Sequence, residues 1–115
     1  MRYLLLIASE PPATPPTEAD WAAMLEEYNK FGQWAKEKGW VLAGEALEDV
    51  ATATTVSVRD GTRIVTDGPF AETKEHLGGY YVIDVPSLDD AIEAASRIPD
   101  ATFGRVEIRP IKEFG

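Results

Sequence analysis

The sequence contains no cysteine and only one histidine among its 115 residues. Without cysteine the chain can form no disulfide, offers no thiolate nucleophile and builds no cysteine-based zinc site. A single imidazole cannot build a histidine cluster, and we predict no metal site. The N-terminal apolar run, residues 3–8, is too short for the core of a signal peptide or for a membrane span. We therefore expect a cytoplasmic protein.

Basic residues are also few. Eleven Lys and Arg stand against 20 Asp and Glu, which gives a net charge of −9. A field of this sign repels phosphates and anionic lipids, so we expect neither nucleic acid nor a membrane surface as partner. The length and the 44% hydrophobic content are those of one globular domain. We predict a single domain over residues 1–115.

Two helices are predicted, and both begin with the same capping pattern. Thr-x-x-Asp at residues 17–20 and Ser-x-x-Asp at residues 87–90 are typical of helix N-termini. We expect the first helix to end at Gly39 and the second before Pro99. The first helix has an apolar stripe at helical spacing, formed by Trp21, Met24, Leu25, Tyr28, Gly32 and Ala35.

Extended segments surround these helices. Asp60-Gly61 between two β-branched runs predicts a hairpin with a type I′ turn. Gly78-Gly79 indicates a bulge or a close backbone approach at the start of a strand. Each end of the chain therefore has the order strand, helix, strand, with the hairpin between them. We predict a ferredoxin-like α+β sandwich, with an antiparallel sheet and two helices on one face. The predicted strands cover residues 3–8, 40–47, 52–58, 63–66, 80–85 and 103 or 105 to 111.

Several strands are apolar on both sides. Residues 3–8 and 80–83 do not alternate between polar and apolar, as a strand with one wet face would. Two helices bury only one face of the sheet. We therefore predict a homodimer in which two sheets pack face to face.

Five stretches together resemble the YCII-related, or DGPF-domain, family. The most specific is Thr-Asp-Gly-Pro-Phe-Ala-Glu-Thr-Lys-Glu at residues 66–75; the others are residues 42–47, 78–81, 87–91 and 107–110. The resemblance covers essentially the whole chain. It implies the dimeric α/β-barrel superfamily, in which two ferredoxin-like sheets pack into one barrel.

The resemblance also implies possible functions. A related branch includes a dehydrochlorinase-type activity and is proposed to use a histidine and an acid near the first helix; Tyr28 and Glu37 stand at those positions here. Similar proteins are often encoded beside, or fused to, extracytoplasmic-function sigma factors. The superfamily allows heme or flavin, but the chain has no phosphate-cradling glycine motif, and we predict no cofactor.

Candidate site residues gather around the Asp-Gly-Pro-Phe turn. This turn is either purely structural or a rigid loop that aims Asp67 into a pocket as a base or a polar anchor. The polar residues after it either form a solvated linker or line a pocket mouth. In the second case Glu72 is a base, Lys74 binds a substrate carboxylate and His76 is an acid. Phe70 and Thr73 complete the predicted lining.

Three further candidates lie outside this segment. Glu45 either faces solvent at the sheet edge or points inward, where it needs a partner such as Arg109. Arg109 is otherwise either a structural ion-pair residue or, like Lys74, a residue that holds an anionic substrate. Tyr28 is either a core aromatic or a phenol that hydrogen-bonds a ligand or acts as an acid.

Three functions are compatible with these residues. The first is binding of a small organic acid or phenol between the first helix and the Asp67 loop, with cofactor-free proton transfer such as elimination or isomerisation. The second is a regulatory module that senses a ligand or contacts a sigma factor, since a charge of −9 suits a basic protein. The third is a dimeric scaffold that has lost catalysis.

Overall fold

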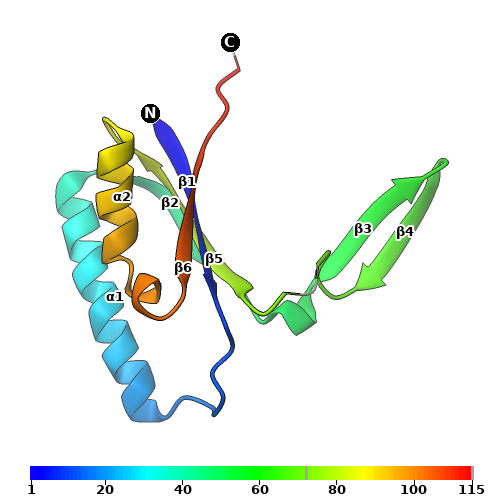
Figure 1. The fold of residues 1–115 in the computed structure, drawn as a ribbon, viewed down its shortest axis with the longest axis horizontal. Helices are drawn as coiled ribbons and strands as arrows, with labels where there is room; N and C mark the ends of the chain where they lie inside the picture. Colours follow the sequence, from blue (N-terminus) through cyan, green and yellow to red (C-terminus); the bar gives the residue numbers. More distant parts are fainter. Residues whose placement is uncertain (72, 115) are drawn as a thin grey trace.

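The computed structural model describes residues 1–71 and 73–114. Within these ranges six strands, two α-helices and two short 3₁₀ helices follow one another (Figure 1). In chain order they are β1 (Arg2–Ser9), α1 (Glu18–Lys38), β2 (Val41–Ala46), η1 (Val50–Thr52), β3 (Thr54–Arg59), β4 (Thr62–Asp67), β5 (His76–Asp84), α2 (Leu88–Arg97), η2 (Pro99–Thr102) and β6 (Arg105–Pro110). None of the helices in the described ranges is both long and apolar enough to cross a membrane.

Four of the strands form one sheet in the order β2-β5-β1-β6. Every neighbouring pair is antiparallel. Both α-helices cover the same face of this sheet (Figure 1). The predicted ferredoxin-like topology is therefore confirmed, and in the described part of the chain neither α-helix lies on the opposite face of the sheet.

The ends of the helices follow the predicted signals. The Thr17 side chain accepts from the Asp20 backbone N–H at 3.1 Å, and Asp20 accepts from the Thr17 backbone N–H at 2.9 Å. Gly39 ends α1 in the left-handed region with φ 67°, which costs a glycine little. The Ser87 side chain caps α2 by accepting from the Asp90 backbone N–H at 3.3 Å, and its hydroxyl donates to the Asp90 carboxylate at 2.9 Å.

The core lies between the helices and one face of the sheet. On β1 the side chains buried in this core are Tyr3, Leu5 and Ile7. The residues that alternate with them point to the uncovered face; they are Leu4, Leu6 and Ala8. The helices contribute mainly aromatic and small side chains to the core. The small side chains allow α2 to pack closely on the sheet. The remaining buried members are Phe31, Ala35, Ile83, Val85, Ala91, Ala94, Ala95 and Ile98.

The predicted apolar stripe of α1 is only partly right. Trp21 and Leu25 are 63% and 62% exposed, while Phe31, which lies outside the predicted stripe, is buried. The first turns of α1 extend beyond the sheet, so their apolar side chains have nothing to pack on (Figure 1). Periodicity gives the face of a helix but not the length over which a neighbour covers it.

Strand β5 begins four residues earlier than predicted. Its first residues pair with the end of β1 beyond a register shift between Ile7 and Ala8. The Gly78-Gly79 pair lies opposite this shift, as the sequence predicts. Gly79 also meets a close backbone approach, because a Cβ there would lie 2.9 Å from the Glu45 carbonyl oxygen.

Strands β3 and β4 form a separate two-stranded sheet, and we call residues 54–67 the arm. Its turn has positive φ at Asp60 (51°) and Gly61 (76°), which confirms the predicted type I′ geometry. The arm projects away from the four-stranded sheet (Figure 1). The molecule is consequently broad and thin, with extents of 49 × 47 × 18 Å.

Candidate functional site

A small cleft lies on the helix-covered face, where α1 and η2 meet the end of the sheet. Its volume is about 190 Å³, and we call it the helix-side cleft. That volume suits a ligand of one ring rather than a larger one, since pockets for drug-sized molecules span ~300–1,000 Å³. The cleft is lined by Ile7, Tyr28, Gly44, Glu45, Ala46, Gly78, Gly79, Tyr81 and Asp100.

The polar end of this cleft is a phenol–carboxyl pair. The Tyr28 hydroxyl, on α1, donates a hydrogen bond to Oδ1 of Asp100, on η2. The Asp100 backbone carbonyl in turn accepts from the Gly104 N–H at 2.7 Å, which fixes the short helix that carries the carboxyl group. Tyr28 and Asp100 are 72 residues apart in the chain, so only the fold brings them together.

Burial governs the acidity of two groups in the cleft. Asp100 is half-buried, and the loss of water around its carboxylate raises its pKa above the usual value. Burial also raises the pKa of the Tyr81 phenol. A carboxylate with a raised pKa is a stronger base than an ordinary aspartate.

Glycines make room for the cleft. A Cβ at Gly44 would overlap Cδ1 of Tyr81, so the Tyr81 ring rests directly on the Gly44 backbone. The other side of that ring packs near Phe31, with 5.3 Å between the ring centroids. Gly44 thus allows an aromatic wall beside the phenol–carboxyl pair.

The electrostatics of the cleft disfavour an anion. Two carboxyl residues, Glu45 and Asp100, belong to its lining, and the described lining residues include no Lys, Arg or His. A carboxylate ligand would therefore meet negative charge with no counter-ion. A neutral ligand with a hydroxyl group can donate a hydrogen bond to Asp100 instead.

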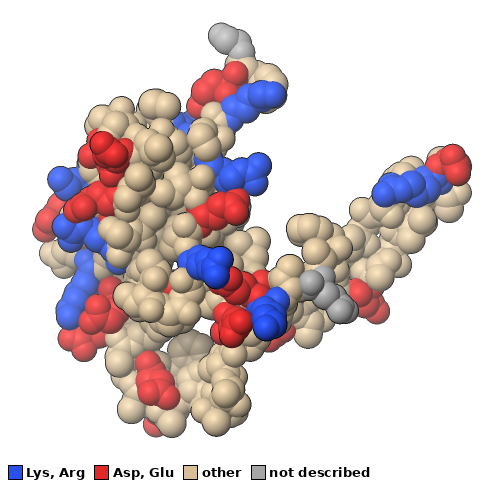
Figure 2. Space-filling model, viewed as in Figure 1, with Lys and Arg blue, Asp and Glu red and all other residues tan. Residues whose placement is uncertain are grey.

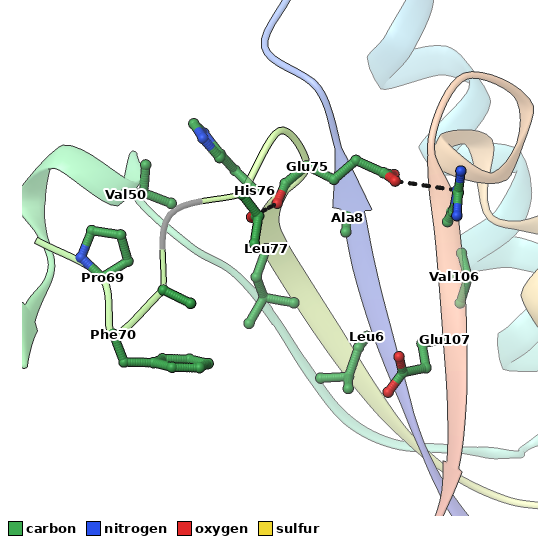
Figure 3. Close-up of a pocket in the computed structure, with 13 residues that line it drawn as sticks. Leu6, Ala8, Val50, Pro69, Phe70, Glu75, His76, Leu77, Val106 and Glu107 are labelled. Carbon is green, nitrogen blue, oxygen red and sulfur yellow. Dashed lines mark hydrogen bonds and ion pairs between the residues drawn. The ribbon is translucent and has the colours of Figure 1, made fainter.

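A larger concavity lies on the uncovered face, between the sheet and the base of the arm. Its volume is about 800 Å³, and we call it the sheet-face hollow. Leu6, Leu77 and Phe70 gather around it (Figure 3). His76 lies at its rim, with its ring directed away from Leu6 and Phe70 (Figure 3). The hollow therefore presents mainly an apolar surface.

One ion pair crosses the edge of this hollow. Glu75 and Arg105 approach to 3.2 Å between Oε1 and Nε (Figure 3). Arg105 is largely exposed, so this contact adds little to stability. It joins the segment before β5 to the start of β6.

The predicted site residues do not form one pocket. Tyr28 and Glu45 line the helix-side cleft. The predicted residues Phe70, Thr73 and His76 line the sheet-face hollow on the other face. The sheet thus separates the two groups.

Three other described candidates line neither cavity. Asp67 ends β4 and is exposed, and Lys74 is exposed in the loop before β5. Arg109 pairs with Glu107 at 3.3 Å rather than with Glu45, since β6 and β2 are the two outer strands of the sheet. Glu72 lies outside the described residues.

The sequence does not identify Asp100 as a site residue, because the residues around it indicate only the end of a helix. It follows Ile98-Pro99, which marks the end of a helix, and nothing nearby distinguishes it from a solvated acid. Its role in the cleft depends on a partner from α1. In residues 1–71 and 73–114 no three His, Asp or Glu side chains come together in a way that would hold a metal ion.

Comparison with known proteins gives three findings. The sequence model of the YCII-related domain family matches residues 1–115. A Rhizobium meliloti (strain 1021) protein described as uncharacterised is 40% identical over 84 residues, which is 67% of this chain and 68% of that protein. The third is a solved structure of 5-chloro-2-hydroxyhydroquinone dehydrochlorinase from Burkholderia phenoliruptrix AC1100 in complex with 2,5-dihydroxybenzoquinone. It has a TM-score of 0.53 at 12% identity and covers 99% of this chain and 96% of its own.

Proposed function

Since the chain belongs to the YCII-related domain family, we propose that it binds a small phenol in the helix-side cleft and removes a proton from it. The observation that carries this proposal is the hydrogen-bonded pair of Tyr28 and Asp100 at the polar end of that cleft. The structural neighbour bound to 2,5-dihydroxybenzoquinone supports the choice of a ring that carries hydroxyl groups.

The proposed geometry gives each group of the pair a role. Tyr28 donates to Oδ1 of Asp100, which leaves Oδ2 to accept a hydrogen bond from the ligand hydroxyl. The raised pKa of Asp100 brings its basicity closer to neutral pH, where a general base works best. The edge of the Tyr81 ring, which lines the cleft, contacts the ligand ring.

The proposed step is a transfer of one proton. The ligand O–H bond breaks, its proton passes to Oδ2 of Asp100, and its electron pair stays on the ligand oxygen. That pair forms a C=O bond while the adjacent ring carbon, which carries the chlorine, takes the proton back from Asp100 to give the keto tautomer. A second ring hydroxyl then loses its proton to water, and its electron pair forms the second C=O bond of a quinone as the C–Cl bond breaks and chloride leaves. No redox partner is required, because the electron count of protein and ligand together is unchanged.

A binding screen tests the ligand class. Purified protein is heated in the presence of small phenols, hydroquinones and benzoates, and the melting temperature is recorded. A phenol at a hundred times its Kd stabilises the folded state by ~2.7 kcal/mol, or several degrees for a domain of this size. Benzoates are expected to give no shift, since the cleft offers them no cation.

Two variants locate the site. Asp100→Asn removes the base and is expected to abolish the phenol shift or weaken it at least tenfold. His76→Gln, on the other face of the sheet, serves as the matched control and is expected to leave the shift unchanged. A shift that survives in Asp100→Asn but disappears in His76→Gln would move the site to the sheet-face hollow and overturn the proposal.

Turnover tests the chemistry separately. Chloride release from a chlorinated hydroquinone is measured with the wild-type chain and with both variants. Loss of a general base is expected to lower kcat by roughly 10²–10⁴-fold with a smaller change in KM. Binding of phenols without any release of chloride would leave a ligand-binding protein rather than a dehydrochlorinase.

A further inference from the structure

The start of α1 carries two large apolar side chains that are exposed. Trp21 and Leu25 are 63% and 62% exposed. The described part of the chain gives them no cover, because the first turns of α1 extend past the end of the sheet (Figure 1). Trp is among the residues that most often dominate the energy of a binding interface. The two side chains therefore indicate a surface on which a ligand packs.

The same face of α1 leads to the helix-side cleft. Residues 21, 25 and 28 are spaced by four and by three, so Trp21, Leu25 and Tyr28 lie on one face of the helix. A helical side chain leans toward the N-terminus of its helix, so Tyr28 is directed over the turn that carries Leu25. Tyr28 lines the cleft, and Leu25 is the next side chain along this face outside it. The apolar face of α1 is thus continuous with the cleft.

The cleft lies at the end of the sheet that α1 overhangs. Residues 44–46, at the end of β2, and residues 78–79, near the start of β5, line the cleft, and α1 continues beyond them (Figure 1). One turn of helix is ~5.4 Å long, so Leu25 lies about one turn and Trp21 about two turns from Tyr28. A phenyl or short alkyl group attached to a ring in the cleft is long enough to reach the first of these turns. A ligand can therefore contact the cleft and the exposed face of α1 together.

The charge around this face disfavours an anionic group. Residues 3–29 contain no Lys or Arg and five acidic side chains, which are Glu10, Glu18, Asp20, Glu26 and Glu27. On the side of the molecule that Figure 2 shows, the start of α1 carries acidic and no basic side chains. A carboxylate or phosphate placed there would be repelled and would find no counter-ion. An apolar, uncharged group suits this surface best.

We propose that the ligand is a phenol with an apolar substituent, with its phenol ring in the helix-side cleft and its substituent packed on Leu25 and Trp21. This inference rests on the proposed function, because it uses the same hydroxyl contact at Asp100. The cleft, at about 190 Å³, holds one ring, and the face of α1 outside it holds the second group. Trp21 and Leu25 then determine which phenol binds and take no part in the proton transfer.

Related ligands measure the contribution of the substituent. Dissociation constants are determined by titration calorimetry for phenol, 3-phenylphenol and 4-phenylphenol. The wild-type chain is expected to bind the better phenylphenol at least tenfold more tightly than phenol, since the added ring buries apolar surface. The anion 4′-hydroxybiphenyl-4-carboxylate has the same two rings and is expected to lose this gain. Equal affinity for phenol and both phenylphenols would overturn this inference alone, whereas no binding of any phenol would overturn the proposed function with it.

Two substitutions locate the second contact. Trp21→Ala and Leu25→Ala remove exposed side chains that belong neither to the core nor to the lining of the cleft. Each variant is expected to bind phenol as the wild type does and to reduce the advantage of the phenylphenol at least threefold. Ile92→Ala shortens an exposed side chain of α2 that lines neither cavity, and this matched control is expected to keep the full advantage. An advantage that persists in both α1 variants would overturn the inference.

The Trp21 indole reports the contact directly. The chain has three Trp residues, so the indole N–H signal that is missing from the NMR spectrum of Trp21→Phe belongs to Trp21. This signal is expected to shift when a phenylphenol is added and to stay in place when phenol is added. Trp34 and Trp40 pack on each other, with 5.7 Å between their ring centroids, and their signals are expected not to move. A bound phenylphenol that leaves the Trp21 signal in place would contradict the proposed contact.

Sedimentation separates a ligand surface from a contact between chains. The wild type and Trp21→Ala are compared at the same protein concentrations without ligand. Both are expected to have the same molar mass, because the proposed role of Trp21 lies in contacting the ligand. A lower molar mass for Trp21→Ala would assign this face of α1 to a contact between chains and would overturn the inference.

Discussion

At the scale of single residues, Gly78 and Gly79 are neighbours in β5 with different surroundings. A Cβ at Gly79 would lie 2.9 Å from the Glu45 backbone oxygen, whereas a Cβ at Gly78 would meet nothing within 4 Å. Gly79→Ala is expected to lower the free energy of unfolding by roughly 1–3 kcal/mol, because β2 must shift. Gly78→Ala is expected to change it by less than about 1 kcal/mol. Urea denaturation of both variants checks this, and equal effects would contradict it.

The burial of Asp100 makes the free energy of unfolding depend on pH. Burial raises its pKa, so the folded chain binds the Asp100 proton more tightly than the unfolded chain does. The wild type therefore loses stability as pH rises from the ordinary aspartate range through the raised pKa. Asp100→Asn removes the buried charge and still accepts from Tyr28. It is expected to be more stable than the wild type at pH 7 and to lose this advantage in acid.

Urea denaturation at several pH values measures this difference. Tyr28→Phe is the control, because it removes the hydrogen bond but keeps the carboxyl group. The free energy of unfolding of Tyr28→Phe is expected to fall with rising pH, as it does for the wild type. An Asp100→Asn variant that is less stable than the wild type at neutral pH would show that the carboxylate is favourably placed as an ion, contrary to the effect of burial.

At the scale of elements, the two capped helices differ in how far the sheet supports them. The first turns of α1 extend beyond the sheet and leave Trp21 exposed, whereas α2 buries Ala91, Ala94 and Ala95. Loss of an N-cap costs ~0.5–2 kcal/mol in helix stability. Ser87→Ala is expected to lower global stability by about that amount. Thr17→Ala is expected to fray the first turn of α1 locally.

Amide hydrogen exchange separates these outcomes. In Thr17→Ala, faster exchange is expected only at the start of α1, with little change in the core strands. In Ser87→Ala, exchange is expected to rise throughout the core. Thr14→Ala, in the proline-rich segment before α1, serves as the control and is expected to change neither. Faster exchange in the core of Thr17→Ala would contradict the limited role assigned to that end of α1.

At the scale of the whole molecule, the breadth and thinness of one chain predict a concentration-dependent stability. If two copies bury each other's apolar surfaces, mass action stabilises the dimer as protein concentration rises. A hundredfold increase in concentration corresponds to ~2.7 kcal/mol, which is several degrees in melting temperature. Calorimetry on the wild type at several protein concentrations is expected to show this rise. A wild-type melting temperature that does not depend on protein concentration would contradict a dimer whose dissociation is coupled to unfolding.

Local chemistry alone determined most of the elements. The capping pattern at Thr17 and the left-handed stop at Gly39 depend on atoms within one turn of helix, and both were predicted correctly. The Asp60-Gly61 turn needs only its own two backbone conformations. The ferredoxin-like topology followed because strand–helix–strand units have a fixed hand.

The sites were decided by the tertiary structure. Tyr28 was identified as a candidate from the sequence, but Asp100 was not, because its partner comes from the other half of the chain. The Asp-Gly-Pro-Phe segment was predicted to face the first helix, yet it lies with Phe70 on the opposite side of the sheet. Sequence patterns report which side chains share an element, since that depends on neighbours in the chain. Which elements face each other depends on how the sheet is ordered and which face the helices cover, and only the folded chain fixes this.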